Sequence, residues 1–228
     1  HEAMAGLELR RDLPPAVLFP AMLAAIERAR EEVVLATYIF ETNDTGRRFV
    51  DALAAARDRG VRVAVLIDGI GELYSFPWAA RLLRKRDVRV LRFLPPRLLP
   101  PRLQINLRNH RKVLVVDGET AFTGGMNIGD RYLAERSENP RRVVDVHARV
   151  TGPVVHHLRR AFVEDWRWVS GETLPEIAST TGPTGAASCR VIADGPSEDL
   201  EKLAMLLVAA ISVATRRVCI MTPYFLPP

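Results

Sequence analysis

The sequence predicts an α/β protein with a mixed, mostly parallel β-sheet that is flanked by helices on both faces. Short apolar runs typical of buried strands alternate along the chain with segments whose apolar residues recur at helical spacing. The 228 residues are 48% hydrophobic and 26% charged, which excludes collagen-like, coiled-coil and disordered chains. Asn43, Asp44 and Thr45 are typical of a helix start, and Gly60 of its end, so a strand–helix–strand unit is expected here.

The remaining elements follow from the same periodicity. Asp117 and Gly118 form a turn between two short apolar runs, which predicts a hairpin. Pro153 suits the first turn of a helix. The predicted helices cover residues 18–29, 46–59, 78–86 and 153–168. The predicted strands cover residues 33–40, 61–67, 88–93, 112–116, 120–123 and 143–150, with a proline-rich loop over 94–109.

The chain divides by composition into a first lobe at residues 1–170, a linker at 171–188 and a further unit at 189–228. The linker is rich in Gly, Thr, Ser, Ala and Pro, and it has little to bury. A shift of 185 positions aligns residues 17–40 with 202–225 at eight identical positions, which predicts an internal duplication. The last unit is then the truncated start of a second lobe, with a strand over residues 218–225.

The distribution of charge indicates what kind of ligand this protein binds. The net charge is +5, and residues 81–111 hold ten basic side chains against Asp87 alone, so this segment is expected to face an anion, although a solvated helix face and loop would look the same. Cys189 and Cys219 lie in apolar runs that favour buried thiols over a disulfide. Charged residues interrupt every apolar run, so no membrane-spanning helix is expected. An anchor upstream of residue 1 is possible, because the chain does not begin with Met.

The chemistry is concentrated between residues 109 and 127. His110 and Lys112 are two positions apart at the start of a strand, so their side chains point to the same face. An ammonium can hold a phosphate oxygen, while a neutral imidazole can attack phosphorus or transfer a proton. Gly124 and Gly125 allow backbone N–H groups to approach an anion, and Asn127 adds an amide donor. A solvated strand end is the alternative explanation of a lone His-x-Lys pair.

These residues resemble the HxKxxxxD and GGxN signature of the phospholipase D superfamily at every position, since His110, Lys112 and Asp117 are followed by Gly124, Gly125 and Asn127. The surrounding sequence is similar to the bacterial cardiolipin synthase subfamily. The segments that carry this similarity are 38–46, 59–71, 106–112, 122–129 and 222–225. The resemblance implies a phospholipase D-like lobe.

The resemblance also implies a two-step transfer through a phosphohistidine. One histidine attacks phosphorus, a second acts as general acid on the leaving alcohol, and neither a metal nor another cofactor is needed. Each half of a two-lobed molecule, or each subunit of a dimer, supplies one motif. This chain carries one, so the expected partner is a missing C-terminal lobe, whose histidine would fall near position 295, or a second subunit. Whether His110 is the nucleophile or the acid stays open.

Members of the superfamily orient the catalytic imidazole with a carboxylate, and Asp145 is the candidate here, with Glu138 as its rival. Asp117 is expected to accept hydrogen bonds in the turn and to support the motif. His147 shares a strand face with Asp145 and is interpreted as structural. His156 and His157 are interpreted as non-catalytic helix residues. Asp68 and Asp44 are interpreted as strand-end and helix-cap residues, with a place in the cleft as the alternative.

Three function classes remain. The first is phosphatidyl transfer of the cardiolipin synthase type on anionic, phosphatidylglycerol-like lipid, by a protein bound peripherally to the cytoplasmic face of a bacterial membrane. Its support is the subfamily resemblance and the loop over 94–109, in which Leu98, Leu99 and Leu103 alternate with Pro and Arg, as in a lipid-facing loop. The second is a phospholipase D-type hydrolase or a nuclease, since a basic surface also suits nucleic acid. The third is a non-catalytic lipid-binding fragment.

Overall fold

A computed structural model describes residues 4–7, 15–98, 101–102, 108–133, 142–177, 182, 185, 187–192 and 202–220. The chain forms two compact units, His1–Val191 and Ile192–Pro228. The first unit contains a six-stranded sheet in the order β4-β3-β2-β7-β8-β9. Its strands are β2 (Glu32–Thr37), β3 (Arg62–Asp68), β4 (Arg89–Phe93), β7 (Val113–Val116), β8 (Thr120–Gly124) and β9 (His147–Thr151).

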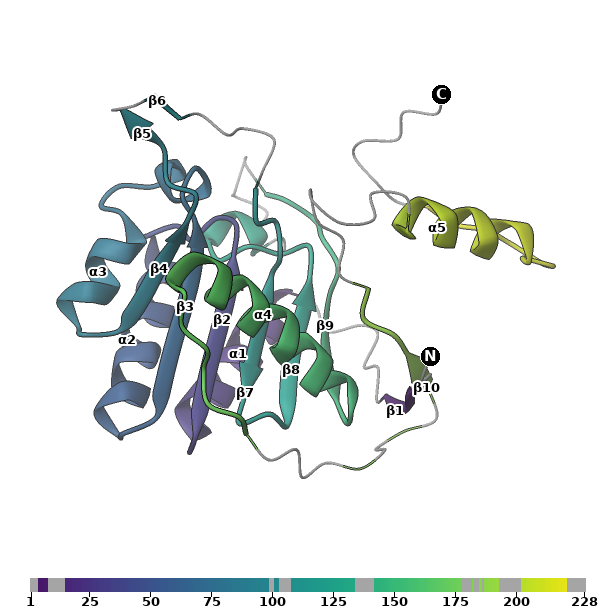
Figure 1. Ribbon diagram of the computed structural model, residues 1–228, viewed down its shortest axis with the longest axis horizontal. Coiled ribbons are helices and arrows are strands. Elements are labelled where there is room, and N and C mark those ends of the chain that lie inside the picture. The colour runs from purple at the N-terminus through teal and green to yellow at the C-terminus, as the bar shows by residue number, and fades with distance from the viewer. Residues whose placement is uncertain are drawn as a thin grey trace. The chain divides into compact units, whose positions relative to one another are not determined.

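Helices cover both faces of this sheet (Figure 1), as the sequence predicts. Helices α1, α2 and α3 lie on one face and α4 on the other. The helices are α1 (Pro15–Arg28), α2 (Asp44–Asp58), α3 (Ala79–Lys85) and α4 (Val154–Ser170), with 3-10 turns η1 (Gly71–Tyr74) and η2 (Asp130–Tyr132). No helix within the described ranges is long and apolar enough to cross a membrane.

The sheet is mixed, with a larger antiparallel part than expected. Strands β2, β3 and β4 run parallel, whereas β2–β7, β7–β8 and β8–β9 are antiparallel pairs. Hairpins can connect antiparallel neighbours directly, while each parallel pair needs a crossover helix. The carboxyl ends of β2, β3, β4 and β8 therefore meet the first residues of β7 and β9 at one edge, hereafter the upper edge.

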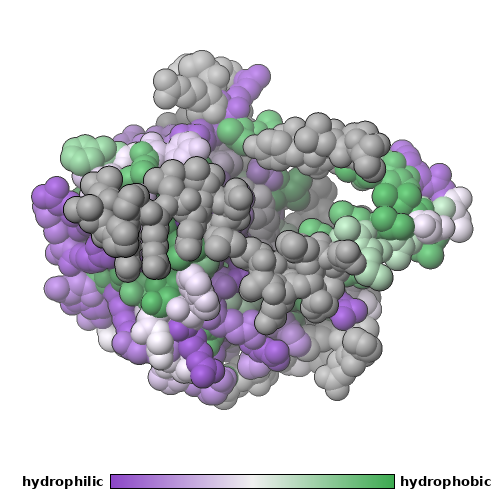
Figure 2. Space-filling model, turned by 45° about the horizontal axis from the view of Figure 1, so that its top comes forward, coloured by the Kyte–Doolittle hydropathy of each residue, from purple (hydrophilic) through white to green (hydrophobic). Residues whose placement is uncertain are grey.

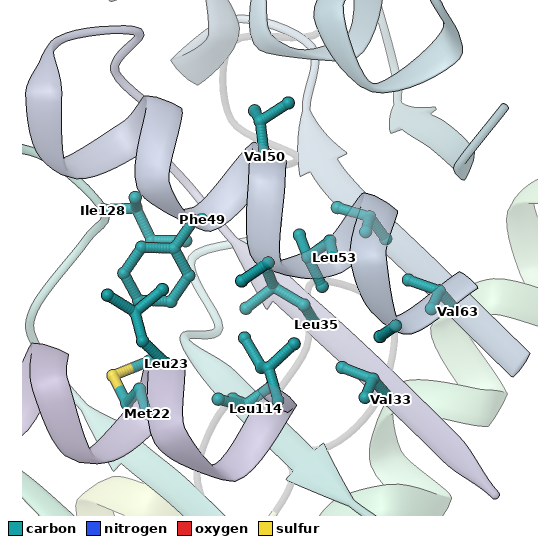
Figure 3. Close-up of a cluster of buried hydrophobic side chains, with 14 of the residues drawn as sticks. Met22, Leu23, Val33, Leu35, Phe49, Val50, Leu53, Val63, Leu114 and Ile128 are labelled. Carbon is teal, nitrogen blue, oxygen red and sulfur yellow. The ribbon is translucent and has the colours of Figure 1, made fainter. Parts of the chain in front are cut away.

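Two apolar layers hold the helices to the sheet, because side chains alternate across each strand. In β2, Val33 and Leu35 pack toward α1 and α2, and Val34 and Ala36 toward α4. Figure 3 shows the first layer, in which Phe49 and Leu53 of α2 meet Leu35. The α4 layer is built on the fully buried rings of Phe162 and Trp166, which stack at 5.8 Å.

Two predicted strands differ in the structure. Residues 142–146 are not in the strand predicted over 143–150, which starts only at His147; Val144 and Val146 are 74% and 59% exposed, so their alternation does not mark a buried face. Within the second unit, helix α5 (Lys202–Ser212) is present, but residues 218–220 form no strand, and 221–225 lie outside the described residues. A strand needs a pairing neighbour, and the described part of that unit offers none.

The ends of the first unit pair with each other. Strand β1 (Met4–Leu7) is antiparallel to β10 (Ala187–Cys189), and the short β5 (Arg97–Leu98) pairs with β6 (Pro101–Arg102). Cys189 is half-buried and Cys219 is exposed, so the prediction of buried thiols is wrong, although both are free cysteines as expected.

Part of the predicted linker is packed into the first unit, where Leu174 and Ile177 are buried. The predicted duplication of a second lobe stays a prediction.

Candidate active site

The candidate catalytic and phosphate-binding side chains lie at the upper edge of the sheet. His110 and Lys112 immediately precede β7, and because β7 is antiparallel to β2 they arrive beside the carboxyl end of that strand, at Tyr38. Asp68 ends the neighbouring β3, and Gly124 ends β8 on the other side. The fold therefore brings the His-x-Lys pair and the glycine pair to one place, as the motif predicts.

The imidazole of His110 packs against an aromatic ring. The ring centroids of His110 and Tyr38 are 4.2 Å apart at 46°. This contact removes solvent from one side of an otherwise exposed residue, and together with the nearby charge of Lys112 it lowers the pKa of His110 below 6.5. The lowered pKa favours the uncharged imidazole, which is the form that can attack an electrophile.

Lys112 supplies the positive charge at this edge. Its Nζ donates a hydrogen bond to the backbone oxygen of His110 at 2.7 Å and lies 5.6 Å from the centre of the Tyr38 ring. Burial lowers the pKa of Lys112, while the carboxylates of Asp145 and Asp68 act in the opposite direction. A cation held by a backbone carbonyl and an aromatic face keeps further N–H donors for an anion.

Two carboxylates clamp the residues that flank His110, Asp68 partly through a backbone N–H and Asp165 through side chains. Asp68 accepts hydrogen bonds from the backbone N–H of Asn109 at 3.0 Å and from the guanidinium of Arg108 at 3.4 Å. From α4, Asp165 accepts a bond from the Asn109 amide at 2.7 Å and forms an ion pair with Arg111. The segment is fixed from the β3 side and from the α4 side at once, so the orientation of the intervening imidazole is restricted.

Local sequence patterns do not predict these contacts. They indicate a strand-end residue at Asp68, with a place in the cleft as the alternative, and they assign no role to Asp165 or to Tyr38. The only available signal was position, since Asp68 directly follows a buried apolar strand and so had to lie at a sheet edge. The pairing of α4 with the segment before β7 is a tertiary contact that no local pattern records.

Asp145 lies beside the glycine pair in the loop that precedes β9. A Cβ on Gly125 would be 2.0 Å from the Asp145 Oδ1 atom, so only glycine allows this approach. The Asp145 carboxylate accepts a bond from the Val146 N–H at 2.8 Å, and its charge acts on Lys112. The Gly125 N–H donates to the Val146 carbonyl at 2.9 Å. The glycines thus bring Asp145 close to Lys112.

Asn127 is buried with its amide engaged at both atoms. Its Oδ1 accepts a bond from the Ile39 N–H at 3.0 Å, and its Nδ2 donates to the Tyr132 hydroxyl at 2.6 Å. This amide joins the segment after β2 to η2, close to the upper edge. A role as phosphate ligand stays a prediction, and it would use the second hydrogen of Nδ2.

Asp117 is not brought to the other motif residues. It follows the last residue of β7, at the opposite end of the strand from Lys112, in a turn with a φ of 52°. Its carboxylate accepts hydrogen bonds from the backbone N–H groups of Arg30, Glu31 and Glu32 at 2.8 to 3.2 Å. Asp117 therefore joins the start of β2 to the hairpin, and its place in the structure is that of the supporting acceptor described from the sequence.

His147 is half-buried at the upper edge, and both of its ring nitrogens are buried without a hydrogen-bond partner among the described residues. Burial and the charge of Lys112 lower its pKa to about 4. A Cβ on Gly124 would lie 3.0 Å from its Nδ1, so the ring lies against that glycine. His156 and His157 belong to α4, with ring centroids 6.1 Å apart. Glu138 lies outside the described residues.

We expect protonation of His147 to lower the free energy of unfolding in acid. An unfolded chain binds the proton with a pKa near 6.5 and the folded chain only near 4, so protons favour unfolding as the pH falls through this range. Lowering the pH from 7.5 to 5 should reduce the free energy of unfolding by about 2 kcal/mol through this group. Urea unfolding of His147→Leu should show much of this pH dependence removed, whereas His156→Leu should retain it. Equal acid sensitivity in both variants would contradict the prediction.

The predicted basic segment is spread over several elements. Arg81, Arg84 and Lys85 lie on α3, Arg89 and Arg92 on β4, and Arg108 and Arg111 beside His110. The side chains of Leu98, Leu99 and Leu103, which the sequence places in a lipid-facing loop, lie outside the described residues.

A known family model matches most of the first unit. Residues 22–166 match the family model described as "Cardiolipin synthase, PLD-like domain", and this match includes all the site residues described above. The chain belongs to this phospholipase D-like family.

Similar proteins include cardiolipin synthases. The chain is 38% identical over 211 residues to cardiolipin synthase A of Pseudomonas putida, which is 92% of this chain and 43% of that protein. It is 36% identical over 226 residues to cardiolipin synthase A of Pseudomonas entomophila, covering 98% and 47% of the two chains. The chain thus spans less than half the length of these relatives. The crystal structure of a phosphatidylserine synthase from Haemophilus influenzae shares the fold, with a TM-score of 0.55 and 13% identity over 71% of this chain and 38% of that one.

Proposed function

We propose that this chain contributes one half of the active site of a phosphatidyltransferase of the cardiolipin synthase type. The observation that carries the proposal is the placement of the His110 imidazole beside the cation of Lys112, in a segment that Asp68 and Asp165 hold through its neighbour Asn109. Family membership and the similarity to cardiolipin synthases support this reaction class. The substrate is an anionic phospholipid with a phosphodiester headgroup, such as phosphatidylglycerol.

The proposed reaction has two displacements at phosphorus. A nitrogen of His110 attacks the phosphodiester, the bond from phosphorus to the headgroup oxygen breaks, and an acid protonates the leaving alcohol. In the second displacement, the acid that protonated the leaving alcohol, now deprotonated, takes the proton from the hydroxyl of an acceptor alcohol. The oxygen of that alcohol attacks phosphorus, and the bond from phosphorus to nitrogen breaks. The lowered pKa of His110 supports the nucleophilic role, because an imidazolium has no lone pair to donate.

The other site residues take supporting roles in this proposal. Lys112 holds a non-bridging phosphate oxygen, with Asn127 as a further donor. Asp145 balances the charge of Lys112 beside Gly125 and is the candidate for orienting the imidazole. Asp117 acts at a distance by fixing the hairpin. The second imidazole is supplied by a second lobe or a second copy of the chain, and the protein acts peripherally at the cytoplasmic face of the membrane.

The test is phosphatidyl transfer on vesicles. Phosphatidylglycerol vesicles are incubated with the protein over a range of concentrations, and glycerol release and the new lipid are followed by mass spectrometry. If two copies form the site, the rate should rise more steeply than linearly with protein concentration. Hydrolysis of DNA without lipid turnover would favour the nuclease function. Vesicle binding without turnover, both by the chain alone and when a second lobe is supplied, would favour the non-catalytic, lipid-binding one.

A further inference from the structure

Four large apolar or aromatic side chains are exposed within six residues at the upper edge. Leu73 and Tyr74 end η1, and Phe76 and Trp78 follow it before α3. Phe76 is 79% exposed, and its ring meets that of Trp78 edge-on at 6.4 Å. Other exposed large apolar residues in the described first unit occur singly or as a pair. A compact group of this kind on a protein surface marks an interaction site.

A basic face adjoins these side chains. Arg81, Arg84 and Lys85 of α3 are three and four residues apart, so they share one side of the helix. In the described part of the chain none of the three forms a salt bridge. With Trp78, Ala80, Arg92 and one carboxylate, that of the buried Glu72, they line a pocket of about 440 Å³. Glu72 is paired with Arg92 at 3.5 Å, so it does not balance the charges on α3. Like charges at this spacing repel each other, and an anionic ligand would relieve that repulsion.

The surface is connected to the catalytic edge. The ring of Tyr74 lies 6.4 Å from that of Tyr38, which in turn packs against His110. Figure 2, with the top of the molecule turned forward, shows hydrophilic residues gathered over the side that α2 and α3 form in Figure 1. A ligand surface that covers residues 73–85 would therefore lie next to the site.

We infer that residues 73–85, hereafter the docking surface, bind the interface of an anionic lipid bilayer, which deepens the proposed function and rests on it for the identity of the lipid. Trp and Tyr favour the headgroup level of a membrane, and Leu73 and Phe76 can bury apolar area below it. The basic face attracts anionic headgroups. The phosphate backbone of a nucleic acid offers charge but would leave the exposed side chains of Leu73 and Phe76 without an apolar environment.

The test measures binding of the chain to vesicles by flotation, without any requirement for turnover. Vesicles with phosphatidylglycerol should bind the chain, those of phosphatidylcholine alone should bind it weakly, and binding should fall with added salt. The variant Arg81→Gln/Arg84→Gln/Lys85→Gln should lose about 100-fold in affinity, at about fivefold per charge. The variant Phe76→Ser/Trp78→Ser should lose roughly tenfold or more.

Matched controls come from the opposite edge. Arg28, Arg30 and Arg149 are exposed and line a separate pocket there, so Arg28→Gln/Arg30→Gln/Arg149→Gln removes the same charge from another place. Val17→Ser is the apolar control, at an exposed position of α1. Both should bind like the parent chain, and circular dichroism checks the fold of all variants.

Several outcomes would overturn the inference. Among them are equal losses in the two charge variants, binding of duplex DNA but not vesicles, and a dimer that Phe76→Ser/Trp78→Ser converts to monomer without effect on lipid. If the variants within residues 73–85 bind vesicles poorly while they continue to transfer detergent-dispersed lipid, the docking surface and the proposed function both stand. Vesicle binding that survives in every variant, with transfer intact, rejects the docking surface alone.

Discussion

Replacement of His110 by Ala should lower the rate of phosphatidyl transfer by about three orders of magnitude or more, without unfolding the chain. The reason is that the covalent route has no other nucleophile once the imidazole is removed. The side chain is exposed, and the clamp uses the backbone and side chains of its neighbours, so the bonds of Asp68 and Asp165 survive the change. The measurement is lipid turnover by mass spectrometry, together with thermal unfolding.

His156→Ala is the matched control, because this half-buried histidine of α4 lies outside the candidate site. It should retain the parent rate. Binding of tungstate, measured by calorimetry, gives a second readout that does not need turnover: it should weaken in His110→Ala and in Lys112→Ala but not in His156→Ala. Residual transfer above a few per cent in His110→Ala would contradict the mechanism.

Replacement of Glu32 by Gln should cost about 3 to 5 kcal/mol of unfolding free energy. Glu32 begins β2 and is 1% exposed, and its carboxylate accepts bonds from Arg159 of α4 at 2.6 and 3.1 Å. Arg159 also donates to the Pro175 carbonyl at 2.6 Å and is 3% exposed. Loss of the carboxylate charge leaves the buried guanidinium with neutral acceptors, the Pro175 carbonyl and the new amide oxygen, and with the exposed Glu176 carboxylate at 3.8 Å. The buried positive charge is then no longer balanced at its inner end, which is strongly destabilising.

The double variant Glu32→Leu/Arg159→Leu should recover much of this loss, since an apolar pair removes both buried charges. The exposed pair of Arg160 and Glu164 on the same helix, at 3.1 Å, is the control, and breaking it should cost under about 0.5 kcal/mol. Urea unfolding provides the free energies. Equal costs for the buried and the exposed pair would contradict this account.

Much of the fold could be predicted because each element depends on its own residues. The helix over 44–58 begins at the N-cap Asn43, whose side chain accepts from the Gly46 N–H. The apolar run 33–36 forms the middle of β2, which is buried at all six of its positions. The prediction failed where burial depends on distant partners. Val144 and Val146 alternate like a strand yet face solvent, and residues 218–220 have no pairing strand among the described residues.

The sequence by itself determined that a histidine and a lysine face one side before a strand, and that a glycine pair follows, because these relations depend only on spacing and on the twofold repeat of a strand. The tertiary structure decided which groups surround them. Antiparallel pairing of β7 with β2 carries Asp117 to the far edge and Tyr38 to the near one, and the packing of α4 brings Asp165 to Asn109. Such contacts join residues more than 50 positions apart, and they follow from strand order and layer packing, which local sequence patterns do not specify.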